Sequence, residues 1–186
     1  MAPARRRGRP IRSDAILRDA RVEDAAAIGA LHARVWAETY RDLATPEALA
    51  RLDAARRAAG WRAALSDADA PNDLIVVESV TRIIGFTAVG PGGHDVFAGR
   101  GEIKQLYVDQ AHQGGGLGRL LMQAAARRLA KRGFTSCALA VVEDNDRAKK
   151  FYERLGGKDA GGFTDPGPLW KSRNRLMVWD DIRALF

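Results

Sequence analysis

The sequence lacks the features that mark disulfide-bonded, metal-binding and membrane-spanning proteins. A single cysteine excludes both an internal disulfide and a thiolate metal cage. The histidines, His32, His94 and His112, show no metal-ligand spacing, so we expect no metal. No apolar run approaches the ~20 residues of a membrane span, which excludes an integral membrane protein. Without an apolar signal segment at its start, and with one cysteine, the chain is expected in the cytoplasm.

Acidic residues are absent from residues 1–12, which contain five of the arginines. The whole chain has a net charge of +7, so the rest of it is close to neutral. We therefore expect a disordered basic leader over 1–12, with a transit peptide as the alternative, and one folded domain over 13–186. A near-neutral body argues against nucleic-acid binding, except through the leader.

Apolar periodicity predicts an α/β chain in which helices and strands alternate in the second half. A helix is expected up to about Tyr40, and a second from Thr45 to about Leu65 with a break at Gly60. The unit from 102 to 142 is predicted to be a βαβ crossover, which implies a parallel strand pair. Strands are expected at 15–18, 74–77, 83–86, 102–108, 137–142 and 175–179, a loop at 90–93, and further helices around 117–129 and 148–155.

Glycines are concentrated where the strand at 102–108 gives way to the helix that starts at Leu117. Because glycine has no Cβ, the N–H groups of this loop can approach a ligand closely. The helix N-terminus adds free N–H donors and a partial positive charge, and Arg119 adds a cation at the rim. The segment is suited to hold a phosphate or pyrophosphate, although the residues alone also allow a flexible surface turn. It matches neither the dinucleotide fingerprint nor the P-loop.

Two motifs carry a resemblance to a known family. The Gln-x-x-Gly-x-Gly spacing at 113–118 resembles the acyl-CoA signature of the GNAT superfamily of N-acetyltransferases. The block at 145–156 is similar to that family's Asn-x-x-Ala-x-x-Phe-Tyr-x-x-x-Gly segment. The resemblance covers about 14–180. It departs from the family pattern where glutamine replaces the commoner arginine, and at Gly157, where an aromatic usually stands.

The resemblance implies an α/β GNAT fold: a mixed, strongly twisted central sheet flanked by helices, with a splayed parallel strand pair that binds acyl-CoA. It implies acetyl-CoA as the donor and a primary amine as the acceptor, which attacks directly in a ternary complex. The backbone of Leu106 and Val108 would pair with the pantetheine arm, and the loop amides would bind the pyrophosphate. The residues assigned in this way to acetyl-CoA are Leu106, Tyr107, Val108, Gln113, Gly114, Gly115, Gly116, Leu117, Gly118, Arg119 and Asn145.

Two residues are candidates for proton transfer. Tyr152 matches the family tyrosine that protonates the departing thiolate, and a core aromatic is its alternative. Glu102 is the candidate base, acting through water, with an exposed acid or a partner of Lys104 as alternatives. Strand alternation predicts that Glu102, Lys104, Leu106 and Val108 share one face. Tyr107 would then pack on the opposite face.

The remaining candidates concern the acceptor. By the resemblance, Trp36, Tyr40 and Trp170 come from the two regions that wall the acceptor site, and each could equally be packing. Asn145 could also be a helix N-cap. Cys137 is expected to be a buried, inert thiol. A non-catalytic acyl-CoA-binding module is the alternative function, and a homodimer and the identity of the amine are left open.

Overall fold

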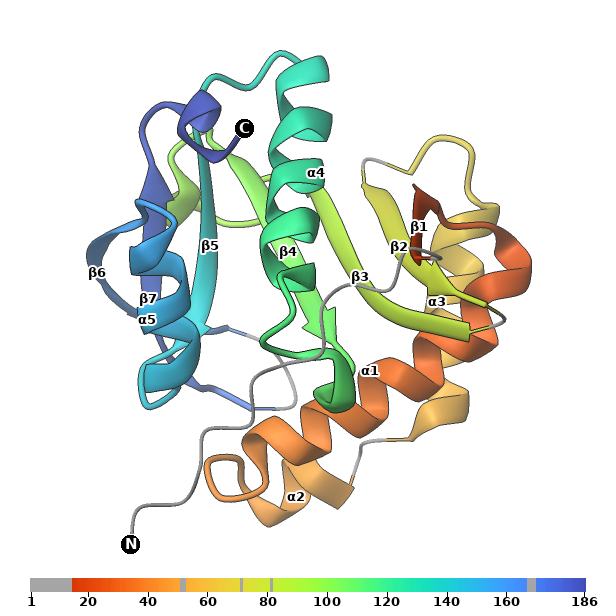
Figure 1. The fold of residues 1–186 in the computed structure, drawn as a ribbon. Helices are drawn as coiled ribbons and strands as arrows, with labels where there is room; N and C mark the ends of the chain where they lie inside the picture. The colour runs from red at the N-terminus through yellow and green to blue at the C-terminus, as the bar shows by residue number, and fades with distance from the viewer. Residues whose placement is uncertain (1–14, 51–52, 71, 81, 167–169) are drawn as a thin grey trace, which may run out of the picture.

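The computed structural model describes residues 15–50, 53–70, 72–80, 82–166 and 170–186 (Figure 1). The basic leader predicted for 1–12 lies outside these residues. Within them, no helix is long and apolar enough to cross a membrane. The strands are β1 (Ala15–Asp19), β2 (Asp73–Ser79), β3 (Arg82–Pro91), β4 (Gly101–Val108), β5 (Cys137–Val142), β6 (Lys158–Thr164) and β7 (Arg173–Trp179). The α-helices are α1 (Ala25–Tyr40), α2 (Pro46–Ala50), α3 (Ala54–Ser66), α4 (Leu117–Lys131) and α5 (Asp146–Arg154), and the 3-10 turns are η1 (Val22–Asp24), η2 (Asp95–Phe97), η3 (Gln110–His112) and η4 (Ile182–Leu185).

The described strands form one mixed sheet in the order β1-β2-β3-β4-β5-β7-β6. All neighbours are antiparallel except β4 and β5, which the α4 crossover makes parallel. These two strands are in register only at Gly101 with Cys137 and at Glu102 with Ala138. Beyond Glu102 they separate, and this opens a gap at the C-terminal ends of both strands. The predicted crossover and parallel pair are confirmed.

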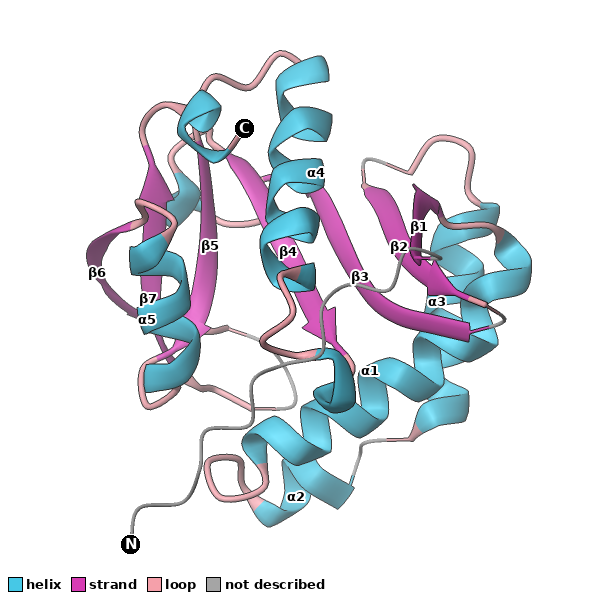
Figure 2. Cartoon of the chain, viewed as in Figure 1, coloured by secondary structure: helices cyan, strands magenta, loops and turns pink. Residues whose placement is uncertain are grey.

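Helices cover both faces of the sheet (Figure 2). One face carries α4 and α5, and its core includes Met122, Leu129, Tyr152 and Trp179. The opposite face carries α1 and α3, and its core includes Ile28, Leu31, Val35 and Phe86 from α1 and β3, with Trp61 and Leu65 of α3 beside them. Helix α1 runs across the lower end of the sheet in Figure 1, below the gap between β4 and β5.

Four details differ from the sequence prediction. In place of the second predicted helix there are two, α2, which ends at Ala50, and α3, which Asp53 caps, and Gly60 lies inside α3. Strand β6 was not predicted, because its segment has glycines and no apolar alternation and is ordered by pairing with β7. Gly90 and Pro91 belong to β3 and not to a loop.

The fourth difference is a β-bulge in β4 opposite Ala88 and Val89. Ile103 packs on the α4 face, and so do Leu106 and Val108. Residues an odd number apart in a regular strand would face opposite sides. The predicted common face of Glu102, Lys104, Leu106 and Val108 is therefore wrong, because the bulge inverts the alternation between Ile103 and Leu106.

Candidate active site at the open end of the parallel strand pair

The gap between β4 and β5 leaves one edge of β4 without a neighbouring strand. The N–H of Asp109 donates to the carbonyl of Ile84 at the end of β3. Backbone direction alternates along an antiparallel ladder, so the N–H and C=O groups of Leu106 and Val108 point away from β3, into the gap. Such groups can pair with the amides of an extended ligand. The two residues predicted for this role are the ones whose backbone faces the gap.

The glycine loop follows β4 and leads directly into α4. The Gln113 side chain donates from Nε2 to the carbonyl of Val108 at 2.9 Å, so it holds the loop against the strand end. Gly114 and Gly116 have φ of 81° and 95°, a region that favours glycine, and Gly116 is the N-cap of α4. No side chain caps this helix end, so its first N–H groups stay available for an anion.

Gly118 has a different reason to be glycine. A Cβ at this position would lie 3.0 Å from the ring of Phe151 on α5, so the residue allows α4 and α5 to approach each other. Gly157 likewise leaves room for Trp179, whose ring would lie 2.7 Å from a Cβ. The aromatic that usually stands at this point in the family pattern would therefore collide with Trp179.

An ion cluster anchors the start of the loop. Asp109 is buried, accepts from Arg34 of α1 at 2.7 Å and from the Ala111 N–H, and contacts His112 at 3.2 Å. Burial raises the pKa of Asp109, but the hydrogen bonds from His112 and Ala111 and the charges of Arg34 and Arg82 outweigh it, so the pKa is lowered. The sequence did not suggest Arg34 as the tie between α1 and the end of β4.

Asn145 and Tyr40 meet on the β5 side of the gap. The Oδ1 of Asn145 accepts from the Ala148 N–H at 3.2 Å, so the N-cap role is confirmed. The Asn145 side chain lies near the Tyr40 hydroxyl at the end of α1. Burial raises the pKa of Tyr40 more than the Asn145 amide lowers it. A ligand in the gap would therefore meet an asparagine whose side-chain oxygen is fixed by the start of α5.

Tyr152 is a residue of α5 whose ring belongs to the core between this helix and the sheet. The ring stands edge-on to that of Trp179, with 6.3 Å between the ring centroids. Burial raises the pKa of its phenol, and the nearby Tyr40 phenol adds to this. The pKa of Tyr107 is raised by burial and by the phenols of Tyr40 and Tyr152. Three phenols from α1, β4 and α5 thus lie close together. The ring of Tyr107 packs on Phe86 and His32, as predicted for the face opposite Leu106.

Glu102 lies at the closed end of the gap, where β4 and β5 are still paired. Its Oε2 accepts from the Lys104 ammonium at 2.7 Å and from the Gly93 N–H at 2.9 Å. The Lys104 partnership expected as an alternative is therefore present. Among the described residues Oε1 has no such partner, so it can still accept from a water.

The three aromatic residues predicted for the acceptor wall lie together. Ring centroids are 5.0 Å apart for Trp36 and Tyr40, 5.8 Å for Trp36 and Trp170, and 5.5 Å for Tyr40 and Trp170. They bring the end of α1 against the segment before β7.

Cys137 is fully buried, and burial raises the pKa of its thiol to about 12, which agrees with an inert thiol.

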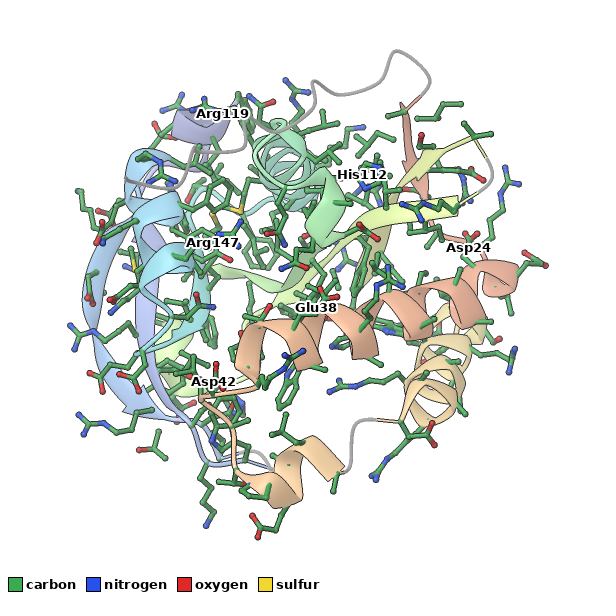
Figure 3. All side chains as sticks on the ribbon, turned by 60° about the horizontal axis from the view of Figure 1, so that its bottom comes forward. Asp24, Glu38, Asp42, His112, Arg119 and Arg147 are labelled. Atoms are coloured by element: carbon green, nitrogen blue, oxygen red, sulfur yellow. The ribbon has the colours of Figure 1, made fainter. Side chains whose placement is uncertain are left out.

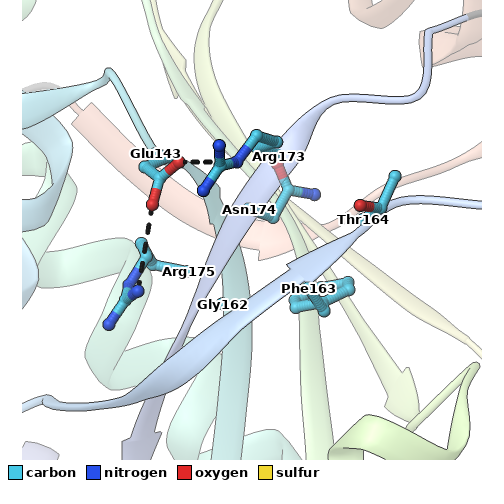
Figure 4. A pocket seen from close by; sticks show the side chains of 7 residues that line it. All are labelled: Glu143, Gly162, Phe163, Thr164, Arg173, Asn174 and Arg175. Carbon is cyan, nitrogen blue, oxygen red and sulfur yellow. Dashed lines mark ion pairs between the residues drawn. The ribbon is translucent and has the colours of Figure 1, made fainter.

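A hollow of about 450 Å³ lies where β5 ends and β7 begins. Glu143 lies between Arg173 and Arg175 on its wall, at 3.0 and 3.8 Å, and Phe163 and Asn174 line it as well (Figure 4). Its charges are therefore paired within the protein. In the described residues, no group of three or more acidic, histidine or cysteine side chains could hold a metal ion.

Comparison with known proteins shows which family has this sequence pattern and this fold. Residues 33–157 match the model of the acetyltransferase (GNAT) family. Mycothiol acetyltransferase of Saccharomonospora viridis is 38% identical over 92 residues, which are 47% of this chain and 30% of that protein. The chain thus spans less than a third of that relative. The uncharacterized N-acetyltransferase YuaI of Bacillus subtilis is 25% identical over 171 residues, 91% of this chain and 95% of that protein.

Solved structures share the fold. The PaiA N-acetyltransferase of Thermoplasma acidophilum in complex with coenzyme A has a TM-score of 0.71 at 17% identity, covering 88% of this chain and 97% of that one. YncA of Salmonella typhimurium with acetyl-CoA has a TM-score of 0.66 at 21% identity, covering 90% and 94%. The sheet with its opened parallel pair is the fold of these proteins, and the chain belongs to the GNAT acetyltransferase family.

Proposed function

We propose that this protein transfers the acetyl group of acetyl-CoA to a primary amine by direct attack within a ternary complex. The observation that carries the proposal is the opened parallel pair, which ends at a helix N-terminus without a side-chain cap. Structural neighbours that contain coenzyme A or acetyl-CoA support the donor. The mycothiol acetyltransferases match over too small a part of their length to supply the acceptor.

The gap would hold the donor along its length. The backbone groups of Leu106 and Val108 would pair with the pantetheine arm, and Asn145 would contact it from the other side. The Val108 carbonyl already accepts from Gln113, so its N–H is the group left for the ligand. The loop amides from Gly114 to Gly118 would surround the pyrophosphate, with Arg119 at the rim.

The reaction needs a neutral amine, and ordinary alkylammonium groups have a pKa near 10.4. Deprotonation at pH 7 thus costs about 4.6 kcal/mol, which a base can reduce. We assign the proton to Glu102 through a water on Oε1. The leaving thiol has a pKa of about 8.5, well below the raised pKa of Tyr152. Tyr152 would therefore stabilise the thiolate chiefly by donating a hydrogen bond.

The test is acetyl-CoA-dependent release of free thiol on a panel of primary amines, with mass spectrometry of the acetylated product. Acetylated amine is the expected result. Tight acetyl-CoA binding without turnover of any amine would identify a binding module instead. If calorimetry detected no acetyl-CoA binding, both functions would be excluded.

A further inference from the structure

One carboxylate at the open end of the gap has no role in the proposed acetyl transfer. Glu38 on α1 is partly buried, and its Oε2 is fully covered and has no hydrogen-bond partner among the described residues. A covered carboxylate oxygen without a partner is unfavourable, because nothing replaces the water that it has lost. Such an oxygen is free to accept from a donor outside the protein chain.

The neighbours of Glu38 along α1 fix its position relative to the gap. Arg34, one turn earlier, reaches Asp109 at the end of β4. Tyr40, two residues later, lies near Asn145, which follows β5 and caps α5. Glu38 therefore lies on the part of α1 that crosses the mouth of the gap. In Figure 3 it lies at the centre of the view on the inner side of α1, whereas Asp24 and Asp42 lie toward the two ends of the helix.

The helical spacing gives the same orientation. Ile28, Leu31 and Val35 form the buried stripe of α1, and Glu38 is the next position of that stripe. At Glu38 the helix has passed the hydrophobic core. The preceding residues of the stripe pack against the sheet, and the stripe then ends in a carboxylate. An acid at a stripe position is unfavourable unless a cation or donor meets it.

Glu38 forms no ion pair with a cation among the described residues. Arg34, one turn earlier on α1, is paired with Asp109 at 2.7 Å. The aromatic wall of Trp36, Tyr40 and Trp170 lies at the same end of α1, but Trp36 and Tyr40 are each two residues from Glu38 and so lie on another side of the helix. A covered carboxylate that lacks a cation suits an organic ammonium ion.

We propose that Glu38 binds the ammonium group of the acceptor, so that the protein takes up its acceptor as a cationic primary amine. This rests on the proposed acetyl transfer. The Glu38 carboxylate accepts hydrogen bonds from the ammonium group and holds it at the mouth of the gap before it reacts, and Glu102 remains the base assigned to the later proton transfer. Glu38 is thus a specificity-determining residue that contacts the substrate.

The experiment compares Glu38→Gln with wild type on two matched probes, 2-phenylethylamine and O-benzylhydroxylamine. The two molecules have nearly the same shape, but only the first is a cation at neutral pH. Binding to the coenzyme A-loaded protein is measured by calorimetry, and turnover by thiol release. Asp42→Asn is the matched control, because it removes an exposed carboxylate four residues further along the chain.

Glu38→Gln is expected to weaken 2-phenylethylamine binding and raise its KM by roughly 10–100-fold, the range of a charge-assisted hydrogen bond. O-Benzylhydroxylamine, acetyl-CoA affinity and the Asp42→Asn variant should change little. Equal effects on both probes, or none, would overturn the assignment of Glu38, and so would a wild-type protein that binds acetyl-CoA but not 2-phenylethylamine. If acetyl-CoA itself did not bind, the proposed function would fail, and calorimetry of the amine on the free protein would still judge Glu38.

Discussion

The two ends of α4 offer a matched test of the acetyl-CoA site, because a glycine with positive φ stands at each. Gly116 caps the N-terminus at φ 95°, and Gly133 follows the C-terminus at φ 89°. Only Gly116 lies in the loop proposed for the pyrophosphate. Replacing either glycine by alanine introduces the same backbone strain at opposite ends of one helix.

The cost of folding should be similar in the two variants. An L-residue in the left-handed region costs roughly 1–2 kcal/mol. The loss of unfolded-state freedom returns about 0.4–1 kcal/mol, which leaves a destabilisation near 1 kcal/mol. For a chain of this size, that lowers the Tm by roughly 2–4 °C. A Cβ at Gly133 meets nothing within 4 Å, so no clash adds to the strain there.

The effect on acetyl-CoA should differ. A methyl group at Gly116 would displace the pyrophosphate from the first N–H groups of α4. Losing one charge-assisted hydrogen bond costs about 1.5–3 kcal/mol, or roughly 10–100-fold in Kd. Calorimetric titration should show this loss for Gly116→Ala and nearly wild-type affinity for Gly133→Ala. Wild-type affinity in a folded Gly116→Ala protein would refute the assignment and leave Gly116 as a turn residue.

Four other changes test separate parts of the proposal. Glu102→Gln should lower kcat/KM and shift its pH dependence upward toward the pKa of the amine, and an unaltered profile would assign the proton to another group. Tyr152→Phe should lower kcat by about 10²-fold, the bottom of the acid–base range, with little change in the KM for acetyl-CoA; a wild-type kcat would leave the ring as core packing. Asp109→Asn should cost about 1–3 kcal/mol at pH 7 in urea unfolding. Because the folded-state pKa of Asp109 is lowered, this contribution is present above the unfolded pKa of about 3.9 and is lost as the pH falls below it; an equal deficit at pH 3 would contradict the reasoning. Deleting 1–12 should keep kcat/KM within about twofold, and a large loss would show that the leader takes part in the reaction.

Local signals predicted most of the elements that build the site. The strand, glycine loop and amphipathic helix from 101 to 131 follow one another without interruption, so sequence spacing alone places the loop at the helix N-terminus. Strand β5 was predicted with its exact bounds because its apolar run is bounded by polar residues. Strand β6 was missed because Lys158–Thr164 has no pattern of its own and depends on pairing with β7. Such long-range pairing is not visible in a local window.

The bulge in β4 marks where sequence reasoning about the site stops. Alternation assumes a regular strand, and the bulge breaks it between Ile103 and Leu106. No residue type in this segment predicts a bulge, because the bulge arises from the register in which β3 and β4 pair. Glu102 thereby lies on the face opposite Leu106, which alternation alone does not predict, whereas its contact with Lys104 agrees with an expected alternative.

The sequence contains a signal for Glu38 that its pattern of apolar residues makes visible. Three residues after Val35, an acid continues a stripe that is otherwise apolar, and this conflict between pattern and residue is typical of a functional position. What the sequence could not supply is the path of α1, which is fixed by Arg34 on Asp109 and by Tyr40 on Asn145. These two contacts place the stripe position over the mouth of the gap. A polar residue on an apolar helix stripe therefore becomes evidence of a binding site only when the contacts on either side of it show which part of the fold it faces.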